Sequence, residues 1–360
     1  MFNYFQQSIF GLDLSDLSLK IAALKKRKQD IILTSYGRTE IPPGIIEKGE
    51  IKKETELISL IKKSLTDIKG SPLKTKFCAV SLPETEAFVR VIQLPILNEK
   101  EIGEAIKWEA EANIPMPLEE IYLDWQIIGQ NDNKQNILIG ALPKNLVDEY
   151  LKAFKKTGLT PLIFEIESLA TARAIVKNGP VSLPLLIVDL GIERTSFIIF
   201  YKSTVYFTTS LPFGNNQLIA VIAQSLNIDT ATAKKIKIGT GLDKAYPQNK
   251  LISTALEPFL NEISQKIKEL SIFFKKHSLD MQSPTNQISE TLLCGGGANL
   301  NGLAGYIHNK TKINTKVANP WVNILQVNSK ELPELSYDES ITYTTALGLA
   351  LGGLNFDKKL

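Results

Sequence analysis

Apolar and polar positions alternate along much of this chain in short runs typical of strands, and longer runs with helical spacing separate them. Residues 10–21 predict a strand, a tight turn and a second strand, with Asp13 at the end of the first. The turn supplies the hydroxyls of Ser15 and Ser18, together with backbone N–H groups. Such a turn can hold a phosphate and a metal ion, although most Asp-containing hairpins are only hairpins.

The same order of positions recurs in the second half of the chain. Residues 185–199 give an apolar run, Asp189, a short turn with Gly191, hydroxyl side chains that begin at Thr195, and a second apolar run. Two such Asp-bearing turns would hold a polyphosphate and its divalent ion from both sides. The pattern therefore predicts two related halves.

Between these turns, residues 88–166 predict an inserted unit with the order strand, helix, two strands, helix, strand. Asn98 is a good N-cap for its first helix, with Glu101 three residues further on. Trp108 lies off the apolar face of that helix. A helix of small residues follows the unit, headed by Glu167, and its small side chains permit close packing against a neighbouring element.

The last third of the chain contains a long amphipathic segment and a triple glycine. Apolar spacing over residues 256–274 predicts a helix with one face in the core. A strand then enters the glycines Gly295, Gly296 and Gly297, and a helix follows. Glycines there let a ligand approach bare N–H groups, but a tight turn between strand and helix explains them equally well. Residues 343–352 predict the final helix.

The composition of the chain narrows the range of functions that it supports. A chain of 360 residues predicts at least two domains, and 41 basic against 38 acidic residues give no general attraction for nucleic acid. Cys78 and Cys294 lie in strand-like apolar runs, which favours buried thiols over a disulfide. His277 and His308 have no partners at metal-ligand spacing, which gives zinc or histidine catalysis no support. No segment has the pattern of a signal peptide or membrane span, so we expect a cytoplasmic protein.

Three features in order resemble the actin-like ATPase superfamily: two Asp hairpins, a Glu-led small-residue helix before the second hairpin, and a late strand, triple glycine and helix. Within this superfamily, residues 81–84, 93–95 and 108–115 resemble the PilM family of type IV pilus assembly proteins. The resemblance covers about residues 8–353.

This resemblance implies an α/β protein with the actin-like ATPase fold, in which two lobes with duplicated β-sheet cores carry an inserted FtsA-type subdomain. It assigns residues 1–87 and 166–183 to the first lobe, 1A, and residues 88–165 to the inserted subdomain, 1C. Residues 184–225 and 286–360 would form the second lobe, 2A, and residues 226–285 the subdomain 2B.

The resemblance also implies that ATP and Mg²⁺ bind between the lobes. Asp13 to Lys20 would form the first phosphate loop, Asp189 to Thr195 the second, and Gly295 to Asn299 the adenosine loop. The residues implied to contact the nucleotide are Asp13, Ser15, Ser18, Lys20, Asp189, Gly191, Thr195, Lys237, Gly295, Gly296, Gly297 and Asn299. Asp13 and Asp189 would hold the metal, Lys237 would help to enclose the adenosine, and Glu167 would orient the attacking water.

The implied protein is a cytoplasmic ATP-binding scaffold at the inner-membrane face, in a type IV pilus or a related type II secretion machine. Its partner would be the N-terminal cytoplasmic tail of PilN, held in a groove between the inserted subdomain and the first lobe. Other platform and motor proteins would also bind, and membrane association would run through partners. A homo-oligomer is compatible with the superfamily, and ATP hydrolysis would be weak or absent.

Two alternatives stay open. A nucleotide-free structural relative is favoured by Ser15, because the family usually has glycine there, and by Lys234, where relatives commonly have glutamate. A small-molecule kinase of the same superfamily needs a catalytic aspartate to deprotonate its substrate. Asp124 fits an exposed strand position better than that role.

Overall fold

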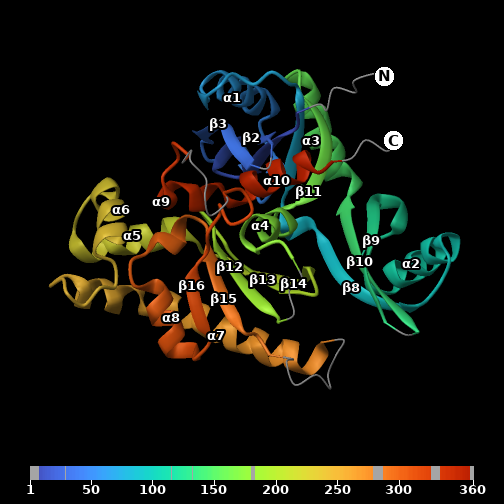
Figure 1. The fold of residues 1–360 in the computed structure, drawn as a ribbon. Helices are drawn as coiled ribbons and strands as arrows, with labels where there is room; N and C mark the ends of the chain where they lie inside the picture. The colour runs from blue at the N-terminus through green and yellow to red at the C-terminus, as the bar shows by residue number, and fades with distance from the viewer. Residues whose placement is uncertain are drawn as a thin grey trace. The chain divides into compact units, whose positions relative to one another are not determined.

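The structure is a computed structural model that describes residues 8–28, 30–114, 116–131, 133–179, 183–278, 287–325 and 333–356. The chain forms two compact units (Figure 1). Unit 1 comprises Met1–Asn178, Pro320–Ser336 and Tyr343–Leu360, and unit 2 comprises Gly179–Asn319 and Tyr337–Thr342. Each unit has its own central β-sheet.

Six strands form the sheet of unit 1, in the order β11-β7-β1-β2-β3-β6. The pairs β1–β2, β2–β3 and β3–β6 are antiparallel, whereas β7 is parallel to β1 and β11 is parallel to β7. Ser15 pairs with Ser18 across the first turn, which confirms the predicted hairpin. The bounds are β1 Phe10–Ser15, β2 Ser18–Arg27, β3 Asp30–Glu40, β6 Lys69–Gly70, β7 Phe77–Leu82 and β11 Thr160–Ile166.

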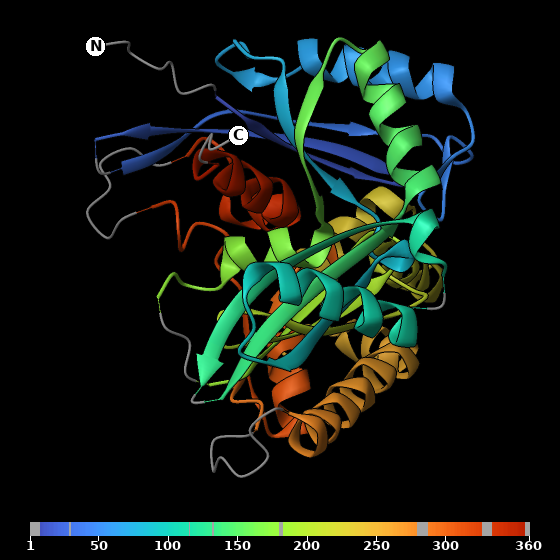
Figure 2. The ribbon, with the colours of Figure 1, turned by 90° about the vertical axis from the view of Figure 1, so that its right-hand side faces the viewer.

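Helices cover both faces of this sheet (Figure 2). Helices α1 (Glu54–Thr66) and α3 (Lys144–Lys156) pack on the face that presents the large apolar side chains Leu12, Leu14 and Leu19. Helices α4 (Glu167–Ile175) and α10 (Thr344–Leu354) pack on the face that presents Gly11, Ala22 and Ala79. Because strand side chains alternate between faces, one strand sequence specifies both the large-residue and the small-residue face.

Small residues bring α10 very close to its neighbours. A Cβ atom added to Gly11 of β1 would lie 2.1 Å from the carbonyl oxygen of Ala346 in α10. A Cβ atom added to Gly348 of α10 would lie 1.8 Å from the carbonyl oxygen of Ala170 in α4. Helix α10 is therefore fixed between β1 and α4 by backbone contacts, as the small residues of α4 predicted.

A three-stranded antiparallel sheet of order β8-β10-β9 forms the insertion in unit 1. Helix α2 packs on one face of this sheet through Ile102 and Ile106, and Trp108 on its outer side is 72% exposed. The bounds are β8 Phe88–Pro95, α2 Glu99–Asn113, β9 Ile121–Asn131 and β10 Lys134–Pro143. Short elements complete unit 1: β4 Ile46–Glu47, β5 Glu50–Ile51, and 3₁₀ turns Glu84–Glu86 and Leu118–Glu120.

Two segments of the predicted subdomain map make contacts outside the subdomain to which they were assigned. Residues 144–165 were assigned to the insertion, but β11 pairs with β7, and Tyr150 and Phe154 of α3 join the core beneath β1. Residues 286–360 were assigned to the second lobe, but Pro320–Ser336 and Tyr343–Leu360 cluster with unit 1. Helix α10 packs on the small-residue face of the first sheet, which explains why Tyr343–Leu360 clusters with unit 1. The division into four subdomains stays a prediction.

The sheet of unit 2 repeats the first sheet strand by strand. Its order β14-β13-β12-β15-β16 matches β3-β2-β1-β7-β11, with the same two antiparallel and two parallel pairings. This repetition confirms the predicted duplicated sheet cores. The bounds are β12 Leu185–Leu190, β13 Thr195–Tyr201, β14 Thr204–Leu211, β15 Glu290–Cys294 and β16 Asn314–Val317.

The longest helix of unit 2, α7, begins before the predicted segment and contains Pro258. It buries Ile263, Ile267 and Phe274, while Phe259 packs edge-on against Phe213 with ring centroids 5.0 Å apart. No helix in the described ranges has the length and apolar character that crossing a bilayer requires. The bounds are α5 Asn215–Leu226, α6 Thr230–Gly239, α7 Asn249–His277, α8 Leu303–Thr311, α9 Tyr337–Ser340, and 3₁₀ turns Gly296–Asn299 and Ile341–Tyr343.

Candidate functional site

A buried ion pair stands at the end of the first hairpin in unit 1. Asp13 of β1 lies opposite Lys20 of β2 and is only 5% exposed. Its Oδ2 accepts a hydrogen bond from Lys20 Nζ at 2.8 Å, and its Oδ1 accepts one from Ser81 Oγ at 3.1 Å. Ser81 Oγ also accepts the N–H of Leu14 at 3.1 Å. The structure thus joins two predicted site residues and adds Ser81, from the end of the parallel strand β7.

The hydroxyls of the first turn bond within the turn. Ser15 Oγ donates to the carbonyl oxygen of Ser18 at 3.1 Å and lies 3.0 Å from Ser18 Oγ. The neighbouring Asp16 carboxylate accepts the N–H groups of Lys48 and Gly49 at 2.7 and 2.9 Å. These bonds fix the turn, and they direct the Ser15 side chain toward Ser18.

Glu167 is the first residue of α4 and is half-buried. Its charge acts on Tyr150, whose pKa is raised mainly by burial and further by the carboxylates of Asp16 and Glu167. The protonated Tyr150 hydroxyl donates a hydrogen bond to the carbonyl oxygen of Gly49 at 2.8 Å. Both carboxylates therefore lie close enough to influence one phenol in unit 1.

Asp189 in unit 2 lies at the end of β12, opposite Ser196 of β13 and beside Cys294 of β15. Gly295, the residue that follows β15, has φ +77°. A Cβ atom added to Gly295 would lie 2.2 Å from Asp189 Oδ1. Only glycine allows this close approach of the carboxylate to the backbone. The triple-glycine turn is thus shaped around Asp189.

A buried lysine joins the glycine turn to the start of α5. Lys237 of α6 is 3% exposed, and its Nζ donates to Asn215 Oδ1 at 2.5 Å and to the carbonyl oxygen of Gly296 at 2.6 Å. Asn215, the first residue of α5, also donates its N–H to the carbonyl oxygen of Gly191 at 2.8 Å. Asn215 therefore connects two predicted site residues, Lys237 and Gly191, although it is absent from the prediction.

The surroundings of Lys237 favour an anionic or strongly polar ligand. Both of its hydrogen-bond partners among the described residues are neutral oxygens. Burial, with a smaller contribution from the charge of Lys234, lowers the pKa of Lys237 to about 8. An ammonium group beside the N-terminal end of a helix attracts negative charge.

Two further predicted residues hold the surrounding backbone. Thr195 is fully buried, and its Oγ1 donates to the carbonyl oxygen of Phe213 at 2.9 Å, immediately before Gly214 and α5. Asn299 Nδ2 donates to the carbonyl oxygen of Asp338 at 2.7 Å. The Thr195 side chain therefore positions the segment that leads into α5, and the Asn299 side chain holds α9.

Asp13 and Asp189 can each supply only one carboxylate ligand to a magnesium ion. No group of three or more His, Cys, Asp or Glu residues converges in the part of the chain that the structure describes. Mg²⁺ is commonly held by one or two carboxylates together with phosphate oxygens and water. Asp13 and Asp189 are compatible with that role toward an ion that is bound to phosphate.

Stability should rise with pH because of Lys237. The unfolded chain keeps the Lys237 proton up to about its ordinary pKa of 10.5, whereas the folded chain releases it near pH 8. Between these values the unfolded state binds more protons, so the free energy of unfolding increases with pH. From pH 7 to pH 9.5 this linkage contributes about 2 kcal/mol.

Urea denaturation of the parent chain and of Lys237→Met at both pH values measures this contribution. The difference between the two free energies of unfolding isolates Lys237 from the other titrating groups. Equal changes in both proteins would show that Lys237 has the same pKa in the folded and unfolded states.

Two sheets of one strand order, each with an Asp-bearing hairpin, define the fold of the actin-like ATPases. The profile of the family described as type IV pilus assembly protein PilM matches residues 11–354, and the chain belongs to this family. Among solved structures, a chain of the PilM-PilN type IV pilus biogenesis complex is similar, with a TM-score of 0.76, 25% identity, and coverage of 98% of this chain and 100% of that one.

More distant relatives share the fold. MreB5 of Spiroplasma citri bound to AMPPNP has a TM-score of 0.54 and 14% identity, covering 96% of this chain and 95% of that one. The cell division protein FtsA of Borreliella burgdorferi is 23% identical over 198 residues, which are 51% of this chain and 46% of FtsA. FtsA of Neisseria meningitidis is 22% identical over 41% of this chain and 39% of its own length. The chain thus spans less than half the length of these curated relatives.

Proposed function

We propose that this chain is an ATP-binding scaffold in the inner-membrane assembly platform of a type IV pilus or a related secretion machine. Its specific partner is the N-terminal cytoplasmic tail of PilN. The observation that carries this proposal is the likeness, over nearly the full length of both chains, to a chain of the PilM-PilN complex. The scaffold is cytoplasmic and reaches the membrane through its partners.

The residues of both units support a nucleotide ligand. In the proposal, Asp13 holds Lys20 toward a phosphate group, and Asp189 provides the second carboxylate near the metal-bound phosphates. Lys237 and the turn from Gly295 to Asn299 enclose the adenosine. Bound Mg²⁺ would neutralise phosphate charge. Glu167 would orient a water molecule. We propose that hydrolysis is slow or absent, because phosphoryl transfer requires the metal, the water and the phosphate to be placed together.

The PilN tail is proposed to bind unit 1 in extended form, between the inserted sheet and the six-stranded sheet. Extended peptides gain affinity from main-chain hydrogen bonds and specificity from pockets for alternate side chains. The inserted sheet ends at the long strands β8 and β9, whose outer edges suit this mode.

A synthetic PilN tail should bind the purified full chain with 1:1 stoichiometry in isothermal titration calorimetry. A peptide with the same composition in scrambled order is the control, because it keeps charge and length but loses the alternation of side chains. No binding of the authentic tail, or equal binding of both peptides, would contradict the partner assignment.

Mg-ATP should bind the parent chain, and Asp13→Ala and Asp189→Ala should each weaken this binding at least about tenfold, the effect of losing one charged contact. Equilibrium titration with a fluorescent ATP analogue measures the affinity, at a temperature at which circular dichroism shows each variant folded. Lys268→Ala, an exposed position on α7, is the matched control. A parent chain that binds no nucleotide would leave the nucleotide-free scaffold, the alternative that the Ser15–Ser18 contact favours.

A further inference from the structure

Helix α2 presents an exposed tryptophan in an acidic setting. Trp108 is 72% exposed, the largest value among the exposed large hydrophobic residues that the structure describes. Glu104 and Glu111 lie one turn before and after it on the same side of the helix, and both are exposed. Lys107 pairs with Glu104 at 2.8 Å, but exposed pairs of this kind contribute little. The inner face of α2 is already occupied, so Trp108 has no packing role in its own subdomain.

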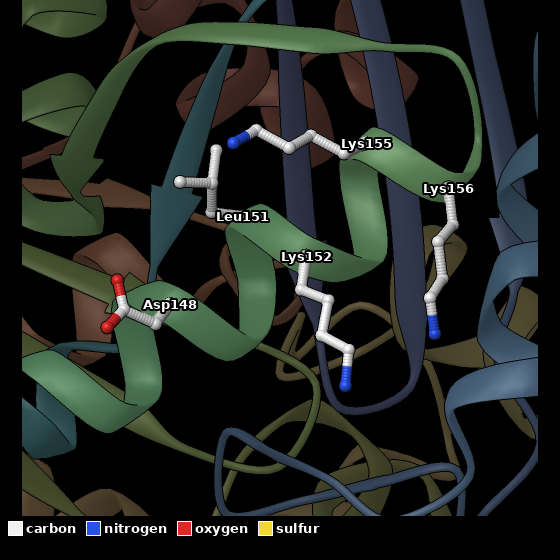
Figure 3. Close-up of a pocket in the computed structure, with 5 residues that line it drawn as sticks. All are labelled: Asp148, Leu151, Lys152, Lys155 and Lys156. Carbon is white, nitrogen blue, oxygen red and sulfur yellow. The ribbon is translucent and has the colours of Figure 1, made fainter.

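Helix α3 carries a surface of opposite character. A shallow depression of about 400 Å³ lies along this helix, lined mainly by apolar atoms of Leu151 and of lysine side chains. Figure 3 shows that the side chains of Leu151 and Lys155 extend to the same side of the helix. The lining residues are Asp148, Leu151, Lys152, Lys155 and Lys156.

The charge on this depression is positive and partly uncompensated. Lys156 pairs with Glu54 at 2.8 Å. In contrast, Lys152 and Lys155 are exposed and form no ion pair with any residue that the structure describes. Asp148 is the single acidic residue in the lining, and its carboxylate accepts the hydroxyl of Tyr122 at 2.9 Å. An acidic ligand with an apolar centre suits such a surface.

The two surfaces match each other in chemistry. A tryptophan flanked by carboxylates complements an apolar depression edged by ammonium groups, since buried tryptophans anchor many interfaces and lysine stacks favourably on the indole face. We infer that α2 of one copy of this chain docks on α3 of a second copy. Trp108 fills the depression, and Glu104 and Glu111 face Lys152 and Lys155. This self-association needs neither nucleotide nor PilN.

Sedimentation velocity over a concentration series of the full chain tests the inference. The parent chain should associate reversibly, and Trp108→Ala should weaken association at least about tenfold, as expected for an interface anchor. Tyr246→Ala removes another exposed aromatic, in unit 2, and should leave association unchanged. Circular dichroism checks that the variants fold. A monomeric parent, or equal loss in both variants, would overturn the inference.

Charge reversal identifies the two faces independently. Glu104→Lys with Glu111→Lys, and separately Lys152→Glu with Lys155→Glu, should each abolish self-association. Mixing these two variants should restore it, because each contact then joins opposite charges again. Lys244→Glu with Lys250→Glu changes the net charge as much as Lys152→Glu with Lys155→Glu does, at exposed sites of unit 2, and should have no effect. If the mixture stays monomeric, α2 and α3 do not contact each other and the inference is wrong. If the unit 2 variant also fails to associate, the loss is a general effect of charge, and the inference is wrong as well.

Discussion

Gly348→Ala should lower the free energy of unfolding by at least about 3 kcal/mol, the upper range for overpacking a core. The added Cβ atom would lie 1.8 Å from the carbonyl oxygen of Ala170 and 2.5 Å from its carbonyl carbon. Both atoms are backbone, so no side-chain rotation relieves the clash. Helix α10 would have to move away from α4, and its contacts with β1 would be lost at the same time.

The matched control is Gly103→Ala in α2, where an added Cβ atom meets nothing within 4 Å. Alanine has the higher helix propensity, so this change should stabilise the protein by up to about 1 kcal/mol. Urea denaturation followed by circular dichroism compares the two variants with the parent. Similar stability of the two variants would mean that the contact between α10 and α4 is looser than the structure shows.

Asp13→Ala should cost about 3–5 kcal/mol, because it leaves the ammonium group of Lys20 buried without its counter-charge. The side chains of Lys20 and Asp13 are only 10% and 7% exposed, so water cannot replace the carboxylate fully. Ser81 Oγ loses its acceptor in the same step. The loss should be visible as a lower midpoint of urea denaturation.

Adding Lys20→Met to Asp13→Ala should recover much of this stability, because replacing both members of a buried pair by apolar groups is often close to neutral. The double-mutant cycle gives the coupling energy between the two side chains. It also separates folding from ligand binding at this hairpin, because the double variant lacks the charges of Asp13 and Lys20 but should fold. A double variant no more stable than Asp13→Ala would show that the buried cation is not the cause.

Local sequence patterns predict much of the fold. The alternation around Asp13 and Asp189 predicts both hairpins, and the structure confirms the strand pairs that follow from them. Period and length also predict the order of elements in the insertion. Such patterns depend on neighbours within one strand or helix, which the linear sequence displays directly.

Other features depend on residues that meet only in the folded chain. Ser81 contacts Asp13 across 68 positions, and Lys237 joins the glycine turn to Asn215 at the start of another helix. No spacing rule connects these residues. The sequence likewise predicts the helix at 343–352 but not where it packs. Helix α10 is apolar on nearly every side, so its pattern does not indicate which sheet it contacts. The roles of the candidate site residues stay predictions for the binding experiments.

The location of α10 also affects the order in which the chain can become folded during synthesis. The strands β1, β2 and β7 leave the ribosome before any strand of unit 2, yet the helix that covers Gly11, Ala22 and Ala79 follows all strands of both sheets along the chain. The sheet of unit 2 and most of its helices are complete before α10 emerges. In the nascent protein, the second unit is therefore ready to close its core before the first, and the small-residue face of the first sheet stays exposed to chaperones until α10 has emerged.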